Sequence, residues 1–258
     1  MKPYLSVVMP VQNGEKVIAD AVTTIIEQTY ENWELIVVND HSTDATESVV
    51  NGFKDPRVRL HSLPEGKTGI AEGRHYGNQH SRGEMIVVAD GDDWNYKNRL
   101  SKICEYFNAH SETDVFYSNV DLFYQDTGVL ETRWFQPFDG ELLRHINYIP
   151  NPASAYKKSA YEKTAGYDAG LRMSEDYDLW LSFLEHGCRF GHISESLVRM
   201  RRHGGSIRIE KAKEHKKWIE KVRKKHGLKP SESAVEELAA PEVSKYFLSE
   251  QKRPLWFG

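Results

Sequence analysis

The sequence predicts an α/β domain in which a mostly parallel sheet is flanked by helices. Two observations support this fold class. Short apolar runs that suit buried strands alternate with segments whose apolar residues recur at helical spacing. Three of these runs lead directly into polar or acidic clusters. Strands that alternate with helices in this way form parallel sheets with right-handed crossovers.

The first part of the chain carries most of this pattern. The apolar run Leu5–Met9 ends at Pro10, and the run Trp33–Val38 ends at the polar stretch Asn39–Asp44. The remaining strands and helices expected here follow from the same periodicities. They are strands at 58–62 and 84–89 and helices at 16–28, 45–53 and 70–80.

The second part is less regular. Residues 115–123 alternate as a strand does, and 128–135 are expected to pair with them as a hairpin. A helix is expected at 176–186. A basic helix is expected after Ser206, until Gly227 and Pro230 end the pattern.

Composition limits the class of protein. A chain of 258 residues with 39% hydrophobic content fits one large domain, or one domain with a small appendage. A net charge of −4 argues against a nucleic-acid partner. Cys104 and Cys188 are expected to be reduced core thiols in a cytosolic protein. No stretch approaches the roughly 18 apolar residues of a spanning helix, so a soluble or peripheral protein is expected.

Charge is distributed unevenly. The segment from Arg199 to Lys229 holds 13 Lys or Arg against 3 Glu, a local net charge of +10, which leaves −14 on the rest of the chain. The helix in this segment has few apolar residues, so it is expected to bury little of itself and to expose its lysines. Residues 208–229 are therefore candidates for peripheral contact with an anionic membrane or with the pyrophosphate of a lipid-linked acceptor; the alternative is a solvated helix that only closes the domain.

The polar clusters that follow the strands are the candidate site. In open α/β sheets, ligands bind beyond the carboxyl ends of the strands. The cluster Asp90-Gly-Asp-Asp93 packs carboxylates that raise one another's pKa unless a cation lies among them, and such oxygens suit Mg²⁺ or Mn²⁺. The chain has neither a P-loop motif nor a Gly-x-Gly-x-x-Gly after its first strand. A metal-held diphosphate is therefore the expected ligand.

Four motifs together resemble the family 2 glycosyltransferases. The run VVMPVQNGEKVIADAVTTIIEQTYENWELIVVNDHSTDAT is similar to the nucleotide-binding half of that family, and Gly83–Trp94 to its strand and Asp-x-Asp motif. Ser174–Trp180 resembles its Glu-Asp motif, and Arg201–Ser206 its late histidine motif. The motifs occur in the family's order over roughly the first 205 residues.

The resemblance implies a GT-A fold and an inverting, metal-dependent transfer of a sugar from a nucleotide-diphosphate donor to an acceptor hydroxyl, in cell-surface glycan or polysaccharide biosynthesis. A UDP-sugar is the favoured donor, and a glycan or lipid-linked molecule the acceptor. The expected location is cytoplasmic, at the inner face of the membrane. The catalytic domain would cover residues 1–205, with a nucleotide-binding half at about 1–94 and an acceptor half at about 95–205. Residues 206–258 would form a basic helical extension.

The resemblance also implies roles for single residues. Asp92 would bind the metal, and His203 would be a further ligand of the metal or the diphosphate. Asp176 would be the base that deprotonates the acceptor. The residues implied to contact the donor are Pro10, Val11, Asn13, Glu15, Asp40, Arg74, Asp90 and Gly91.

Three residues depart from the family pattern around the donor, namely Gln12, His41 and His75. They leave the base and the sugar open. Two other hypotheses remain at this point. A sugar-phosphate nucleotidyltransferase would carry a loop richer in glycine and arginine than residues 10–16. A non-catalytic nucleotide-binding module would not need the pair Glu175-Asp176.

Overall fold

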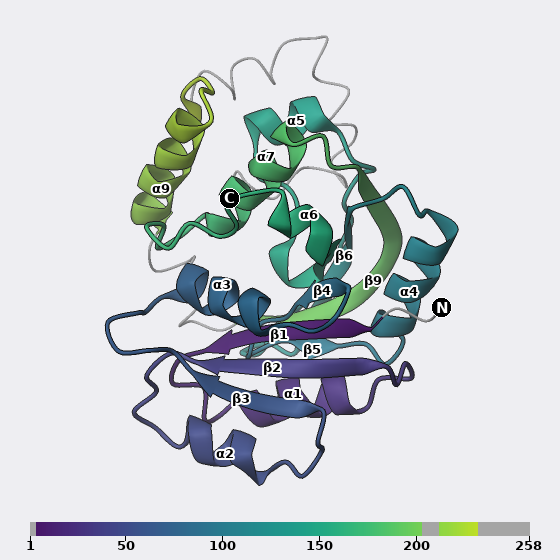
Figure 1. The fold of residues 1–258 in the computed structure, drawn as a ribbon, viewed down its shortest axis with the longest axis vertical. Helices are drawn as coiled ribbons and strands as arrows, with labels where there is room; N and C mark the ends of the chain where they lie inside the picture. Colours follow the sequence, from purple (N-terminus) through teal and green to yellow (C-terminus); the bar gives the residue numbers. More distant parts are fainter. Residues whose placement is uncertain (1–3, 203–211, 232–258) are drawn as a thin grey trace.

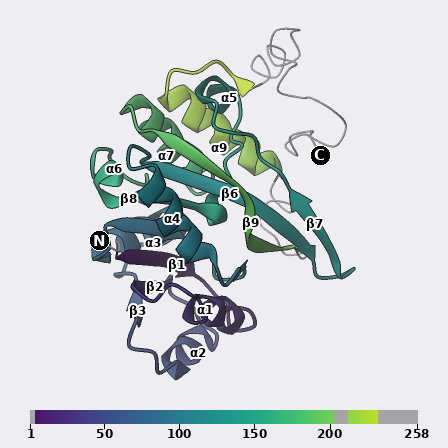
Figure 2. The same cartoon turned by 90° about the vertical axis from the view of Figure 1, so that its right-hand side faces the viewer.

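The computed structural model describes residues 4–202 and 212–231, and one nine-stranded sheet runs through them (Figure 1). A hairpin strand, β7 (Val129–Arg133), pairs with β6 and extends from the body (Figure 2). The other strands lie in the order β3 (Val58–Ser62), β2 (Trp33–Asn39), β1 (Leu5–Val11), β4 (Met85–Val88), β8 (Ser154–Lys157), β6 (Val115–Tyr124), β9 (Phe190–Arg202) and β5 (Trp94–Asn95).

The first half of the sheet is parallel, as predicted. β1 pairs with β2 and with β4, and β2 pairs with β3, all in parallel. Because these strands run in one direction, the loops that follow β1, β2 and β4 meet at one edge of the sheet. We call this the carboxyl edge: residues 12–17, 40–45 and 89–93.

The second half of the sheet is mixed. β8 is antiparallel to both of its neighbours, β4 and β6, so β6 runs in the direction of β4. β9 is parallel to β6, so it also ends at the carboxyl edge. The predicted hairpin is confirmed, because β7 pairs antiparallel with β6. The mostly parallel arrangement therefore holds for the first half, and short antiparallel strands complete the rest.

Helices cover both faces of the sheet. Alternate side chains of β1, such as Val7 and Val8, belong to two separate core clusters on opposite faces. α1 (Ile18–Ile26), α2 (Thr46–Gly52) and α4 (Arg99–Ala109) contribute to the first cluster. The second cluster includes residues of α3 (Ile70–His80), α5 (Gly140–His145), α6 (Lys158–Glu162), α7 (Glu175–Glu185) and α9 (Ala212–Lys225). The short helix η1 (Asn151–Ala153) precedes β8.

Two glycines bring α3 onto β1. A side-chain carbon at Gly73 would lie 2.9 Å from Cβ of Pro10, and one at Gly77 would collide with Val8. Only glycine permits such close packing of helix and strand. The same helix carries Arg74, so this contact brings a guanidinium to the carboxyl edge.

Helix α9 docks on the second core cluster. Val222 is fully buried, Trp218 and Ile219 pack against the cluster, and Arg223 is 2% exposed. The prediction that this helix buries little of itself was wrong, because Arg223 places its charged head on the carbonyls at the end of α5, and a count of apolar residues does not reveal such a contact. No helix in the described part of the chain is both long and apolar enough to cross a bilayer.

Candidate active site

The loops after β1 and β2 are bonded to each other. Asn13, in a left-handed conformation with φ of 52°, accepts from the Thr43 amide at 2.8 Å and donates its own amide to Ser42 Oγ at 2.9 Å. The Glu15 carboxylate accepts from the Ala45 amide at 3.0 Å. The side chains of Asn13 and Glu15, both predicted to contact the donor, thus also shape the rim of the site.

Asp40 supplies a hydrogen-bond acceptor at this rim. Its Oδ2 accepts from the Gly69 amide at 2.8 Å, which fixes the carboxylate. Its Oδ1 is buried and has no hydrogen-bond partner among the described residues. A buried acceptor without a donor is costly, so this oxygen is suited to a donor group on a ligand. The predicted neighbours Pro10 and Val11 are buried at the end of β1.

The three residues that depart from the family pattern bond to the scaffold. Gln12 donates to the Asp40 carbonyl at 3.0 Å, and a ring nitrogen of His41 lies 2.9 Å from the Lys67 carbonyl. His75 bonds to the Tyr161 hydroxyl at 2.9 Å. Each of these side chains therefore holds a loop or helix of the site in position.

An acidic cluster follows β4. Asp90, Asp92 and Asp93 can each bring a carboxylate oxygen within 4.8 Å of the others. Burial, together with the charges of Asp92 and Asp90, holds the pKa of Asp93 well above its usual range. Hard oxygen ligands at this spacing fit Mg²⁺ or Mn²⁺, which would relieve the repulsion. Gly91, at the turn between them, has Ile18 so near that a side-chain carbon would lie 3.2 Å from its Cδ1.

Arg201 fastens the end of β9 to this cluster. Its amide donates to Asp93 Oδ1 at 2.8 Å, and its Nε donates to the Asp92 carbonyl at 3.0 Å. Its guanidinium lies 3.8 Å from the centre of the Trp94 ring and forms an ion pair with Asp20. This role was not predicted from the sequence, although Arg201 belongs to the late histidine motif. The predicted ligand His203 lies outside the described residues.

Arg74 links the acidic cluster to α7. It is 4% exposed, donates to Asp90 at 2.7 Å and forms a second ion pair with Glu175. Burial disfavours the charged guanidinium, but Asp90 and Glu175 outweigh that effect and raise the pKa of Arg74. Hydrogen bonding assigns the Asn151 amide with its oxygen toward Arg74, 2.8 Å from both terminal nitrogens.

The Glu-Asp motif forms the first turn of α7. Glu175 is buried, and this burial raises its pKa, while the charge of Arg74 opposes the rise. Asp176 is half-buried, and its Oδ1 accepts from the Tyr177 amide at 2.8 Å. The helix N-terminus favours a carboxylate at this position. Trp180, one turn further along α7, is fully buried in the core.

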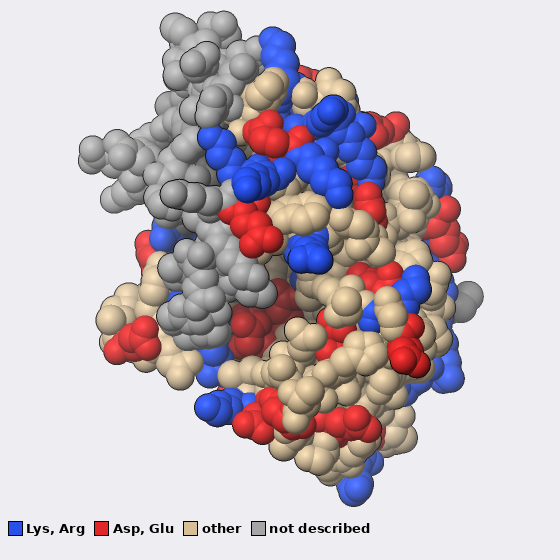
Figure 3. Space-filling model, turned by 90° about the vertical axis from the view of Figure 1, so that its left-hand side faces the viewer, with Lys and Arg blue, Asp and Glu red and all other residues tan. Residues whose placement is uncertain are grey.

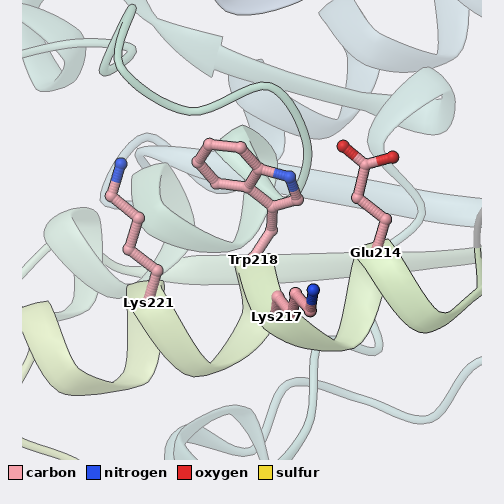
Figure 4. A pocket seen from close by; sticks show the side chains of 4 residues that line it. All are labelled: Glu214, Lys217, Trp218 and Lys221. Atoms are coloured by element: carbon pink, nitrogen blue, oxygen red, sulfur yellow. The ribbon is translucent and has the colours of Figure 1, made fainter.

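The surface around α9 carries charges of both signs. In Figure 3, Lys and Arg side chains gather on the upper part of the molecule, and acidic side chains lie in a hollow below them. A separate cavity of about 540 Å³ is lined, among the described residues, by α9 side chains alone (Figure 4). These are Glu214, Lys217, Trp218 and Lys221, so this cavity is distinct from the acidic cluster.

Sequence comparison identifies relatives that match most of the chain. EpsE of Bacillus subtilis, named as a candidate glycosyltransferase, is 30% identical over 205 residues, which are 77% of this chain and 73% of EpsE. TuaG of the same organism, named as a candidate glycosyltransferase of teichuronic acid biosynthesis, is 28% identical over 223 residues, 84% of this chain and 87% of TuaG.

Solved structures share the fold. S. aureus TarS 1–349 in complex with UDP-GlcNAc superimposes with a TM-score of 0.70 at 18% identity, covering 94% of this chain and 69% of that one. The mannosyltransferase PcManGT from Pyrobaculum calidifontis, in complex with GDP-Man and Mn²⁺, gives 0.69 at 16% identity, covering 97% and 71%. These likenesses confirm the predicted GT-A-like fold. The sequence model described as Glycosyl transferase family 2 matches residues 6–165, and this chain therefore belongs to that family of glycosyltransferases.

Proposed function

We propose that this glycosyltransferase is metal-dependent and inverting, and that it uses a nucleoside diphosphate sugar. The observation that carries the proposal is the pair of bonds made by Arg74. One guanidinium joins Asp90, in the cluster suited to a metal, to Glu175, the neighbour of the proposed base Asp176. Arg74 thereby fixes the acidic cluster, which is expected to hold the diphosphate through a metal, to the turn that carries the proposed base.

The acidic cluster is the proposed metal site. Asp92 is the proposed principal ligand, with His203 as a further ligand from the segment that directly follows β9. The attachment of Arg201 to Asp93 supports this assignment, because it brings the end of β9 to the cluster. When bound, a divalent cation offsets the charge that develops on the leaving nucleoside diphosphate.

Asp176 is the proposed general base. It takes the proton of the acceptor hydroxyl while that oxygen attacks the anomeric carbon from the face opposite the diphosphate. The bond from the anomeric carbon to the diphosphate oxygen breaks as the new glycosidic bond forms, so the configuration inverts. Glu175 is held by Arg74, and Asp178 is bonded to α9, which leaves Asp176 as the half-buried carboxylate of the turn.

The donor is proposed to lie against the rim formed by residues 10–15 and 40–45. The buried Oδ1 of Asp40 would accept from the base or the ribose. Asn13, Glu15 and Gly91 are also proposed to contact the donor. A UDP-sugar is favoured. The TarS and PcManGT complexes support testing both uridine and guanosine donors.

The acceptor is proposed to be a glycan or lipid-linked molecule in polysaccharide biosynthesis at the cell surface, bound by the half at about 95–205. The name of TuaG supports this polymer class. Contact with an anionic membrane through 208–229, at its cytoplasmic face, remains part of the proposal. Lys216 and Lys217 are exposed on α9. Their replacement by Glu should reduce co-sedimentation with anionic vesicles at low salt, and unchanged sedimentation would contradict this contact.

The reaction class can be tested by product analysis. The protein is incubated with UDP-GlcNAc, UDP-glucose or GDP-mannose, with Mn²⁺ or with excess EDTA. Release of nucleoside diphosphate that requires Mn²⁺ is expected for at least one donor. Pyrophosphate release would instead indicate a nucleotidyltransferase, and full activity in EDTA would exclude the proposed metal site.

A further inference from the structure

The residues on either side of Asp176 are held by cations from two different parts of the chain. Glu175 is paired with Arg74 of α3. On the other side, the Tyr177 hydroxyl accepts from Arg223 Nη1 at 3.1 Å. The first turn of α7 is thus attached to the nucleotide-binding half on one side and to α9 on the other.

The attachment to α9 includes a buried carboxylate. Asp178 is 1% exposed, and its two oxygens lie 2.9 Å from Lys225 Nζ and 2.9 Å from His226 Nε2. Lys225 also forms an ion pair with Asp168, in the loop that leads to α7. Without these partners Asp178 would be an uncompensated buried charge, which is strongly destabilising.

Arg223 connects α9 to a third helix. Its Nη1 donates to the carbonyls of Arg144 at 2.7 Å and His145 at 2.8 Å, the last two residues of α5. A cation at this position satisfies carbonyls that lack a partner within the helix. The Tyr177 hydroxyl donates to the carbonyl of Leu143 in the same helix at 3.0 Å. α5, α7 and α9 therefore meet at one guanidinium.

The backbone immediately before the turn is strained. Ser174 has a φ of 60°, in the left-handed region that serine rarely adopts, and it is buried. A conformation of this kind persists only where the surrounding contacts impose it. The contacts of α9 with Tyr177 and Asp178 lie within one turn of this residue.

We propose that α9 is a positioning element for the base, with Arg223, Lys225 and His226 fixing the first turn of α7 so that the Asp176 carboxylate faces the acceptor. This inference rests on the proposed role of Asp176. In this proposal, the three residues do not touch the donor or the acceptor. They act through their contacts with Tyr177 and Asp178. The functional unit therefore extends beyond the matched residues 6–165 to the end of α9.

The variants Lys225→Met and His226→Gln test this role, and Lys224→Met is the matched control because Lys224 is exposed on the same helix. Turnover is measured by nucleotide release from the best of the three donors, and donor affinity by calorimetry with Mn²⁺. We expect kcat to fall about 10-fold to 100-fold in the first two variants, because small displacements of a reacting group are costly. Donor Kd should stay within about twofold, and Lys225→Arg should restore most of the rate.

Amide hydrogen exchange gives a readout that does not depend on activity. Exchange over residues 174–178 should accelerate in Lys225→Met but not in Lys224→Met, while α3 stays unchanged. Unchanged exchange and a kcat equal to that of Lys224→Met would overturn the inference. If Asp176→Asn itself retains full activity, the proposed base is wrong. If Asp176→Asn is inactive and the α9 variants behave as the control, only the positioning role fails.

Discussion

The two clusters of carboxylates in the candidate site, one at the carboxyl edge and one in the first turn of α7, differ in how their charge is balanced. In the cluster after β4, burial and then the charges of Asp92 and Asp90 raise the pKa of Asp93. On α7, the carboxylates beside the proposed base have cationic partners, Arg74 for Glu175 and the pair Lys225 and His226 for Asp178. The carboxylates of the first cluster thus repel one another, whereas those beside Asp176 are paired with cations.

The difference would explain why the proposed reaction uses two acidic motifs. A crowded cluster favours a divalent cation, since the cation lowers the repulsion among the carboxylates. A turn whose neighbouring charges are already compensated can direct one carboxylate to a substrate proton. Arg74 bonds to a member of each group, so it fixes the distance between them.

The largest expected effect comes from removing the base. Asp176→Asn should lower kcat by about 10²–10⁴, the usual cost of a lost general base, with donor affinity nearly unchanged. Steady-state kinetics and donor titration measure the two quantities. Asp126→Asn, in an exposed turn of the β6–β7 hairpin, is the control and should match the wild type. Weaker donor binding at an unchanged kcat would instead make Asp176 a binding residue.

The next effect concerns the link between the two groups. Arg74→Met leaves Asp90 and Glu175 without their shared cation, and breaking a buried pair costs about 3–5 kcal/mol of unfolding free energy. Chemical denaturation measures this loss. Lys97→Met removes the ion pair with Glu27, in which both side chains are exposed, and should cost less than about 1 kcal/mol. Equal losses in the two variants would show that Arg74 does not join the two groups energetically.

The smallest effect is a pH dependence at α9. His226 lies between Asp178 and Glu185, and although burial opposes it, these carboxylates raise the pKa of His226. The stabilisation is therefore complete below the unfolded-state pKa, about 6.5, and is lost as pH rises through the higher folded-state value. The stability gap between wild type and His226→Gln should shrink from pH 5.5 to pH 8.5. A gap that does not change with pH would contradict the charged pairing.

Much of the first half of the fold could be predicted because its signals are local. The strands β1, β2 and β4 are continuous apolar runs, and the clusters that follow them mark the carboxyl edge. In α4, Leu100, Ile103, Cys104 and Phe107 do recur at helical spacing, yet this helix was missed between short, irregular elements. β8 has four residues, too few for a periodic pattern to emerge.

The candidate site was predictable in its residue types but not in its connections. Asp92 and Asp176 lie in motifs with a local signature, whereas the pairing of Arg74 with Glu175 joins positions 101 residues apart. The docking of α9 escaped prediction for a similar reason. A sequence shows that Arg223 is charged, but only the fold shows that three carbonyl oxygens and one hydroxyl oxygen surround its guanidinium.

The proposal that the acidic cluster binds the metal while Asp176 acts as the base can be tested directly by calorimetry. Mn²⁺ is titrated, in the presence of UDP, into wild type, Asp92→Asn and Asp176→Asn. Asp92→Asn is expected to lose Mn²⁺ binding, while Asp176→Asn is expected to bind Mn²⁺ as the wild type does, although its kcat is lowered by about 10²–10⁴. Mn²⁺ binding that survives in Asp92→Asn, or that is lost in Asp176→Asn, would contradict the assignment of metal site and base.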